Sequence, residues 1–228
     1  DPDQVLSVSC IAQDTRQGKQ NVWYFGTGEA FGASASSGGA YYLGNGLYKS
    51  VDSGKTWASL SSTATNTPHD FDGLWDLSWN IALDNSNDTA DVIYSAILGA
   101  IMRSDDGGQS WIKCLGGSTS SFSYCTDVVI TDSGIVYATL SSDGPASQNG
   151  LWRSEDGISW VNINDSLWPA IYDRVVMAVN PYDQKEVYFL AVTPGAGKEC
   201  IAWDGDSEWV SLWKYEDVNN GMWTDLSE

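Results

Sequence analysis

The stretch Gly46-Leu47-Tyr48-Lys49-Ser50-Val51-Asp52-Ser53-Gly54-Lys55-Thr56-Trp57 decides the fold. Its first half alternates apolar and polar side chains, as a β-strand does. Asp52 and Gly54 supply a turn, because an Asp carboxylate accepts backbone N–H groups and glycine takes positive φ cheaply. Trp57 begins the returning strand, where its large apolar surface anchors the hairpin in a core. The segment therefore predicts a tight β-hairpin.

The same pattern recurs three more times along the chain. Residues 100–111 repeat it in full, residues 150–160 repeat it with one residue fewer, and residues 211–223 carry a degenerate copy. The closing tryptophans lie 54, 49 and 63 residues apart, which is the length of one four-stranded sheet with its loops. The residues predicted to form and anchor these turns are Ser50, Asp52, Gly54, Trp57, Ser104, Asp106, Gly108, Trp111, Ser154, Asp156, Trp160, Asp217 and Trp223.

A strand, a polar turn and a second strand precede each hairpin, as in Leu77–Leu83 and Val92–Ala96 before the second copy. Each unit therefore holds four strands. We predict an all-β fold, a β-propeller of four-stranded antiparallel blades, forming one region over residues 1–228. The predicted blades span approximately residues 1–60, 73–115, 125–164 and 172–228. Propellers usually have four to eight blades, and we expect these four to belong to a larger ring.

The recurring Ser-x-Asp-x-Gly-x-x-Trp resembles the Asp-box, or BNR repeat, of sialidases and other secreted propellers. The opening of the chain, Trp23–Glu29 followed by Gly46–Ser50, resembles the sortilin-like (VPS10-type) Asp-box proteins of secreting bacteria. The resemblance implies a secreted or cell-surface protein whose blades occur in sets of six or more. It implies little about activity, because propellers of this kind serve many roles.

Charge and cysteine content restrict the function classes. The formal net charge is −19, from 30 acidic and 11 basic residues, which argues against binding to nucleic acid or to anionic membranes. No stretch approaches the ~20 apolar residues of a membrane span. Cys114 and Cys125 flank a polar loop, and we predict a disulfide between them, which implies an oxidising, extracellular compartment.

Sialidase chemistry is disfavoured, because it needs three arginines on the substrate carboxylate. Arg103 and Arg153 occupy the Lys49 slot of the repeated hairpin and are expected to be structural, which leaves only Arg16 and Arg174.

Other glycoside hydrolases need only two carboxylates at the right separation. The candidates are Asp70, Asp72 and Asp76, beside His69, Phe71 and Trp75 in the loop after the first hairpin, together with Glu29. The competing interpretation is a solvated loop with Trp75 packed into the next blade. No cofactor is expected, apart from calcium at Asp84 and Asp88, where a plain polar turn is the alternative.

Four insertions, residues 31–43, 61–74, 141–149 and 193–208, interrupt the blades and are expected to carry binding. The composition and motifs favour a non-catalytic secreted or surface propeller. It would bind a glycan or a protein, or assemble with copies of itself or with further blades. The alternative is a glycoside hydrolase using propeller-face carboxylates. An enzyme should show two acidic side chains facing one aromatic-lined pocket, with no Lys or Arg neutralising both.

Overall fold

A computed structural model describes residues 7–29, 42–68, 70–118, 124–144, 148–218 and 221–228. The chain folds into four antiparallel sheets, called blades 1 to 4 in chain order. Blade 1 contains β1 (Val8–Gln13), β2 (Trp23–Thr27), β3 (Leu47–Ser50) and β4 (Ala58–Ser59). Blade 2 contains β5 (Ser78–Leu83), β6 (Ile93–Ile97), β7 (Ala100–Ser104) and β8 (Ile112–Gly116), preceded by a short 3-10 helix, η1 (Leu74–Asp76). Blade 3 contains β9 (Thr126–Ile130), β10 (Val136–Leu140), β11 (Gly150–Ser154) and β12 (Val161–Asn162). Blade 4 contains β13 (Val175–Val179), β14 (Glu186–Val192), β16 (Ser207–Glu216) and β17 (Met222–Asp225), and β15 (Lys198–Ile201) pairs with the first part of β16.

Neighbouring strands in each blade follow one another in the chain, apart from the added β15. The predicted fold, an all-β propeller type of four-stranded antiparallel sheets, is confirmed. In the part of the chain that the structure describes, no helix is long and apolar enough to cross a membrane.

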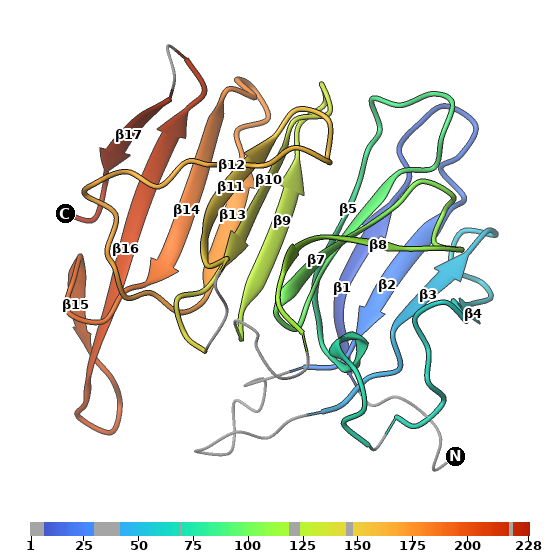
Figure 1. Ribbon diagram of the computed structural model, residues 1–228, viewed down its shortest axis with the longest axis horizontal. Helices are drawn as coiled ribbons and strands as arrows, with labels where there is room; N and C mark the ends of the chain where they lie inside the picture. Colours follow the sequence, from blue (N-terminus) through green and yellow to red (C-terminus); the bar gives the residue numbers. More distant parts are fainter. Residues whose placement is uncertain (1–6, 30–41, 69, 119–123, 145–147, 219–220) are drawn as a thin grey trace.

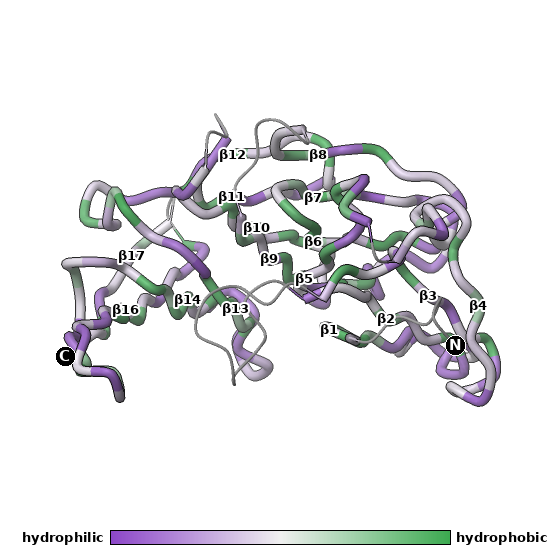
Figure 2. The backbone as a smooth tube through the Cα atoms, turned by 90° about the horizontal axis from the view of Figure 1, so that it is seen from below, coloured by the Kyte–Doolittle hydropathy of each residue, from purple (hydrophilic) through white to green (hydrophobic). Residues whose placement is uncertain are grey.

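The four blades form a fan rather than a stack. Figure 1 shows the sheets following one another from blade 1 at the right to blade 4 at the left. In Figure 2 the inner strands β1, β5, β9 and β13 lie along the concave margin, and the outer strands lie away from it. The inner strands of successive blades therefore converge on the centre of an open arc.

Apolar side chains between adjacent blades form the core. Tyr24 and Leu47 of blade 1 meet Ile81 and Ile93 of blade 2, and all four are almost fully buried. Each such burial stabilises the fold by roughly 1.5–3 kcal/mol. Equivalent clusters join blades 2 and 3 and blades 3 and 4.

The closing tryptophans seal these interfaces. Trp111 of blade 2 packs into the cluster shared with blade 1, Trp160 into that between blades 2 and 3, and Trp223 into that between blades 3 and 4. Trp57 of blade 1 instead lies against Phe25, with ring centroids 4.6 Å apart. Phe25 is paired with Ile11, which is 59% exposed, on the side of blade 1 that faces away from blade 2. The free side of blade 1 therefore exposes apolar side chains, as the sides of blades that pack against one another do.

Blade 4 also has an apolar free side. Val176 and Leu190 are cross-strand partners in β13 and β14, and each is 47% exposed. Their chain neighbours Met177 and Phe189 point the other way, into the core shared with blade 3.

The repeated turns are closed by the serine and aspartate of the motif. Ser104 Oγ accepts the N–H of Gly108 at 2.9 Å and donates to Asp106 Oδ1 at 2.7 Å. Asp106 in turn accepts the N–H groups of Gln109 and Ser110. The Ser110 hydroxyl also donates to Asp106 Oδ2 at 2.6 Å, and this bond together with the other donors lowers the pKa of Asp106 to about 2. Positive φ at Gly108 (92°) lets the chain reverse at this point.

The fourth copy of the motif works differently. Asp217 Oδ2 accepts two hydrogen bonds from the Arg153 guanidinium of blade 3, at 2.9 and 2.7 Å, and one from the Tyr137 hydroxyl. Its carboxylate therefore ties blade 4 to blade 3, which also gives Arg153 a structural role.

The predicted Cys114–Cys125 disulfide is wrong. All four cysteines are free thiols. Cys114 lies on β8, the outermost strand of blade 2, and its Sγ contacts the carbonyl of Gly157 in blade 3 at 3.5 Å. Cys125 lies just before β9, the innermost strand of blade 3, where its N–H donates to Ser141 Oγ. The connecting chain crosses from the rim to the centre of the fan, which separates the two side chains.

Candidate functional site

One edge of the fan collects the functional side chains. The inner strands begin, and the second strand of each blade ends, at this edge, at the bottom of Figure 1. The Ser/Asp turns lie on the opposite edge. Three hollows adjoin one another on the first edge, with volumes of about 370, 540 and 300 Å³. We call them the central, middle and outer hollows.

The middle hollow is lined by three carboxylates, an arginine and a tryptophan. These are Asp143, Asp173, Glu208, Arg174 and Trp79. They come from blades 2, 3 and 4, so the hollow exists only because the blades fan around a centre.

Asp143 and Asp173 lie on two loops that are joined by hydrogen bonds. Ser142 follows β10, and Tyr172 stands before β13. The Ser142 N–H and Oγ both donate to the Tyr172 carbonyl, and the Tyr172 N–H donates to Ser142 Oγ at 2.8 Å. The residue after each of these is one of the two aspartates, so the two carboxylates are held on neighbouring backbone.

The two carboxyl groups have different surroundings. Asp143 Oδ1 accepts hydrogen bonds from the Ser141 hydroxyl and, at 3.1 Å, from the Tyr124 N–H. Among the described residues, the Asp173 carboxylate has no hydrogen-bond or ion-pair partner. Burial, reinforced by the nearby charge of Asp143, raises the pKa of Asp173. The two carboxyl groups therefore differ in their hydrogen bonding, and Asp173 keeps its proton to higher pH than an ordinary aspartate.

Arg174 leaves both aspartates un-neutralised. Its guanidinium lies over the Trp79 ring, 5.2 Å from the centroid, and within the described chain it makes no ion pair with either carboxylate. The Trp79 indole N–H donates to the Tyr124 carbonyl at 3.0 Å, which fixes the ring. Two acidic side chains and one indole ring therefore line the same pocket, and no ion pair with Arg174 neutralises either carboxylate within the described chain.

Asp127 lies at the wall of the central hollow and joins three inner strands. Its Oδ1 accepts from Asn80 of β5 and from its own neighbour Val128, and its Oδ2 accepts from the Met177 N–H of β13, all at 2.8–2.9 Å. The residue is 6% exposed, and burial raises its pKa to about 6. Through these hydrogen bonds Asp127 links β5, β9 and β13 at the centre of the fan.

The carboxylates proposed from sequence lie around blades 1 and 2, away from the middle hollow. Asp76 is buried in η1, and its Oδ2 accepts the N–H groups of Asp72 and Gly73, both at 2.8 Å. Burial raises the pKa of Asp76. Asp72 accepts the Thr67 hydroxyl, and Asp70 is exposed.

The fourth carboxylate candidate, Glu29, and the residues named beside the others lie as follows. Glu29 forms a backbone bridge with Tyr42, and His69 lies outside the described residues. Trp75 packs edge-on against Trp111 at 5.0 Å, in the core between blades 1 and 2.

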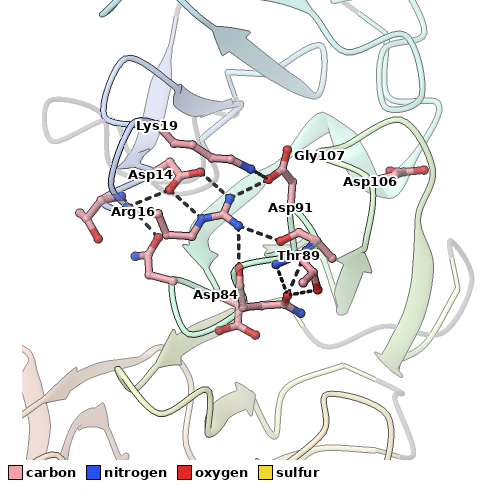
Figure 3. A network of polar contacts seen from close by, with 12 residues as sticks. Asp14, Arg16, Lys19, Asp84, Thr89, Asp91, Asp106 and Gly107 are labelled. Atoms are coloured by element: carbon pink, nitrogen blue, oxygen red, sulfur yellow. Dashed lines mark hydrogen bonds and ion pairs between the residues drawn. The ribbon is translucent and has the colours of Figure 1, made fainter.

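Arg16 is occupied by structural contacts at the opposite edge (Figure 3). Its guanidinium pairs with Asp14 at 2.5 Å and Asp91 at 2.7 Å, and it donates to the carbonyls of Asn87 and Ala90. The network joins the first turn of blade 1 to the first turn of blade 2.

Asp84 and Asp88, the calcium candidates, belong to that second turn. Asp84 Oδ1 is used by Ser86. Within the described ranges, no group of three or more His, Cys, Asp or Glu side chains is arranged to hold a metal. The calcium site stays a prediction.

Sequence reasoning missed Asp143, Asp173 and Trp79 as a group. Two of the four insertions expected to carry binding, residues 141–149 and 193–208, contribute Asp143 and Glu208 to the middle hollow, and residues 145–147 of the former lie outside the described residues, as do residues 31–41 of the first insertion. The available signal was positional: Asp173 and Arg174 directly precede an inner strand, and Trp79 lies at the beginning of another.

Comparisons with known proteins support the propeller fold. No family model matches the chain. The chain is 24% identical over 200 residues to xyloglucanase Xgh74A of Acetivibrio thermocellus, an alignment that covers 75% of this chain and 23% of that protein. An ancestral GH74 enzyme superposes with a TM-score of 0.60 at 17% identity, over 96% of this chain and 26% of the other. An α-L-arabinofuranosidase of Fusarium graminearum gives a TM-score of 0.50 at 14% identity, over 99% of this chain and 67% of the other.

The chain therefore spans about a quarter of the length of the xyloglucanase and of the GH74 enzyme. These relatives correct the function favoured from sequence, a non-catalytic binding or assembly propeller. A curated relative is a xyloglucanase, and the solved propellers of like fold include glycoside hydrolases, so the glycosidase alternative is better supported.

Proposed function

We propose that this chain is the catalytic-face segment of a glycoside hydrolase propeller that acts on a polysaccharide, with Asp143 and Asp173 as its carboxylate pair. The observation that carries the proposal is the middle hollow, where two unequal carboxyl groups face one aromatic side chain. Xyloglucan is the first substrate to test, because the curated relative is named for it.

The different surroundings of the two carboxyl groups suggest their roles. Asp173, whose pKa is raised, keeps a proton and donates it to the glycosidic oxygen as the C–O bond breaks. Asp143, which accepts hydrogen bonds from two donors, acts at the anomeric carbon. It either takes a proton from the attacking water, which inverts the configuration, or attacks directly and forms a glycosyl ester that water then hydrolyses, which retains it. Trp79 offers its ring to a sugar, and Arg174 holds that ring in place.

Further blades complete the site in this proposal. The free sides of blades 1 and 4 expose Ile11, Val176 and Leu190, and sheets of the same four-stranded kind would cover them. We also assign the Ser/Asp turns as Asp-boxes on the support of their hydrogen bonds, and we propose secretion, as is usual for proteins that degrade extracellular polysaccharides.

The test compares Asp173→Asn and Asp143→Asn with Asp183→Asn, an exposed aspartate in the turn between β13 and β14. Reducing-sugar release from xyloglucan and binding to the polymer are both measured. We expect each site variant to lose at least ~100-fold in turnover, as for removal of a general acid or base, while binding stays within a few-fold. Because Asp173 is the acid, its variant should recover part of its rate on aryl glycosides with good leaving groups.

Two results would reject the proposal. One is wild-type protein that neither binds nor cleaves the polysaccharide. The other is turnover that survives in both site variants at the level of the Asp183 variant.

A further inference from the structure

The β15–β16 hairpin is an addition to the four-stranded blade plan, and it extends to the edge that carries the hollows. Figure 1 shows β15 at the lower left, on the side of the catalytic edge. The hairpin is well braced: Ala202 donates to the Asp206 carbonyl at 2.8 Å, and Ser207 Oγ donates to Glu199 at 2.7 Å. A hairpin held in this way presents its tip in a fixed position.

The tip carries apolar side chains with no cover. Trp203 is 94% exposed and Ile201 is 67% exposed. A tryptophan held in water at the end of a braced turn leaves a large apolar surface unburied, which is characteristic of a binding element. Single exposed apolar residues are common, so the argument also needs the surroundings of the hairpin.

The β16 strand of the hairpin lines the outer hollow. Trp209, Ser207 and Glu208 line it, together with Pro194. Glu208 and Val192 line both the outer and the middle hollow. Trp79 and Arg174 line both the middle and the central hollow. The three hollows therefore form one path from the centre of the fan to the hairpin.

The chemistry along this path suits a sugar chain. Trp79 lies at one end and Trp209 at the other, and carboxylates lie between them. Aromatic rings contact the C–H faces of sugars, and carboxylates accept their hydroxyl protons. An anionic polymer is disfavoured, because Asp143, Asp173 and Glu208 outnumber the single cation, Arg174, in the middle hollow.

We infer that the β15–β16 hairpin is a distal sugar-binding subsite, in which Trp209 and the exposed Trp203 hold an uncharged polysaccharide chain beyond the cleavage point. This inference rests on the proposed function, since the path runs past the Asp143–Asp173 pair in the middle hollow. The subsite makes binding depend on ligand length, because an oligosaccharide too short to reach the hairpin gains no affinity from it.

The experiment measures binding of the intact chain to xyloglucan polymer and to its shortest oligosaccharide repeat by calorimetry. The variants are Trp203→Ala, Trp203→Phe and, as a matched exposed aromatic at the opposite edge, Tyr182→Ala, which is 98% exposed in the wild type. Loss of one aromatic stacking contact should weaken polymer binding by roughly five- to tenfold in Trp203→Ala. The phenylalanine variant should recover most of that loss. Binding of the short oligosaccharide, and all binding by Tyr182→Ala, should stay within about twofold of wild type.

The outcomes separate the two proposals. Unchanged polymer binding in Trp203→Ala, or an equal loss for both ligand lengths, overturns the subsite and leaves the catalytic pair standing. Length-selective loss supports the subsite, even if Asp143→Asn and Asp173→Asn retain turnover. Wild-type protein that binds neither ligand removes both proposals. A polyuronate polymer bound more tightly than xyloglucan would contradict the charge argument.

Discussion

Replacing Asp127 with asparagine tests whether the centre of the fan holds a buried carboxyl group whose ionisation opposes folding. Burial raises the pKa of Asp127 from its ordinary value of 3.8 to about 6. A shift of about two units corresponds to ~3 kcal/mol at neutral pH, since each unit is ~1.4 kcal/mol. The folded state binds this proton more tightly than the unfolded state does. Its contribution to stability is therefore complete below pH ~4 and is lost as pH rises through ~6.

About half of the loss, ~1.5 kcal/mol, develops between pH 5 and 7.5 by the same linkage relation. The isoelectric point of the chain is near 4.1, so the protein carries a net negative charge from pH 5 to pH 7.5 and is expected to stay in solution during the measurement. In Asp127→Asn the titration is absent, and its Nδ2 faces either Met177 N–H or the Asn80 amide. The lost hydrogen bond costs roughly 1–3 kcal/mol, independently of pH. The free energy of unfolding of the variant minus that of wild type should therefore rise by ~1.5 kcal/mol from pH 5 to pH 7.5.

Urea unfolding followed by tryptophan fluorescence measures this difference, and the chain has 12 tryptophans to report it. Asp183→Asn is the control, because that carboxylate is exposed. A difference that stays flat within ~0.5 kcal/mol over this pH range, the usual spread for independent surface changes, would refute the reasoning. So would a difference that falls as pH rises, since this would mean that Asp127 is ionised more readily in the fold than outside it.

Three further outcomes are expected. Ser104→Ala should lower the free energy of unfolding, measured in urea, by about 1–3 kcal/mol, because the buried N–H of Gly108 loses its acceptor. The control is Ser110→Ala, which removes an exposed hydroxyl and should lower it by less. Equal losses in the two variants would contradict the role assigned to the turn serine. Gly157→Ala and Gly195→Ala share a positive φ, 69° and 80°, but a Cβ at Gly157 would lie 1.8 Å from the Tyr94 hydroxyl and one at Gly195 meets nothing within 4 Å. The first should therefore cost at least ~1–3 kcal/mol more than the second, measured by thermal unfolding. Finally, because all four cysteines are free, the denatured protein should react with four equivalents of thiol reagent without prior reduction, and a reducing agent should leave its Tm unchanged.

The architecture could be read from the sequence because its signal is local. In Ser50–Trp57 and its copies the turn is closed by hydrogen bonds within a few residues, as between Ser104 and Gly108. Such contacts depend on residue type and spacing alone. The degenerate fourth copy shows the limit of this reasoning, because Asp217 bonds to Arg153, 64 residues earlier in the chain.

The disulfide failed for a related reason. Cys114 and Cys125 are close along the chain, and a hairpin would have brought them together. The intervening segment instead joins the outermost strand of one blade to the innermost strand of the next. The two cysteines are therefore close in sequence but lie at opposite ends of the radius of the fan. Crossings from rim to centre leave no periodic trace in the sequence.

The site was hidden because its members share no local pattern. Trp79, Asp143, Asp173 and Glu208 come from separate segments, and none belongs to the repeated motif. The repeat builds equivalent blades, whereas a catalytic pair needs two carboxyl groups with unequal surroundings, and only departures from the repeat can create these. The segments that interrupt the blades are such departures: Asp143 lies in the loop after β10, and Glu208 lies in the part of β16 that pairs with the added strand β15. In a repeat protein of this kind, acidic residues in an insertion that follows the second strand of a blade, or directly before an inner strand, are therefore better candidates than the densest acidic loop, which here gave Asp70, Asp72 and Asp76.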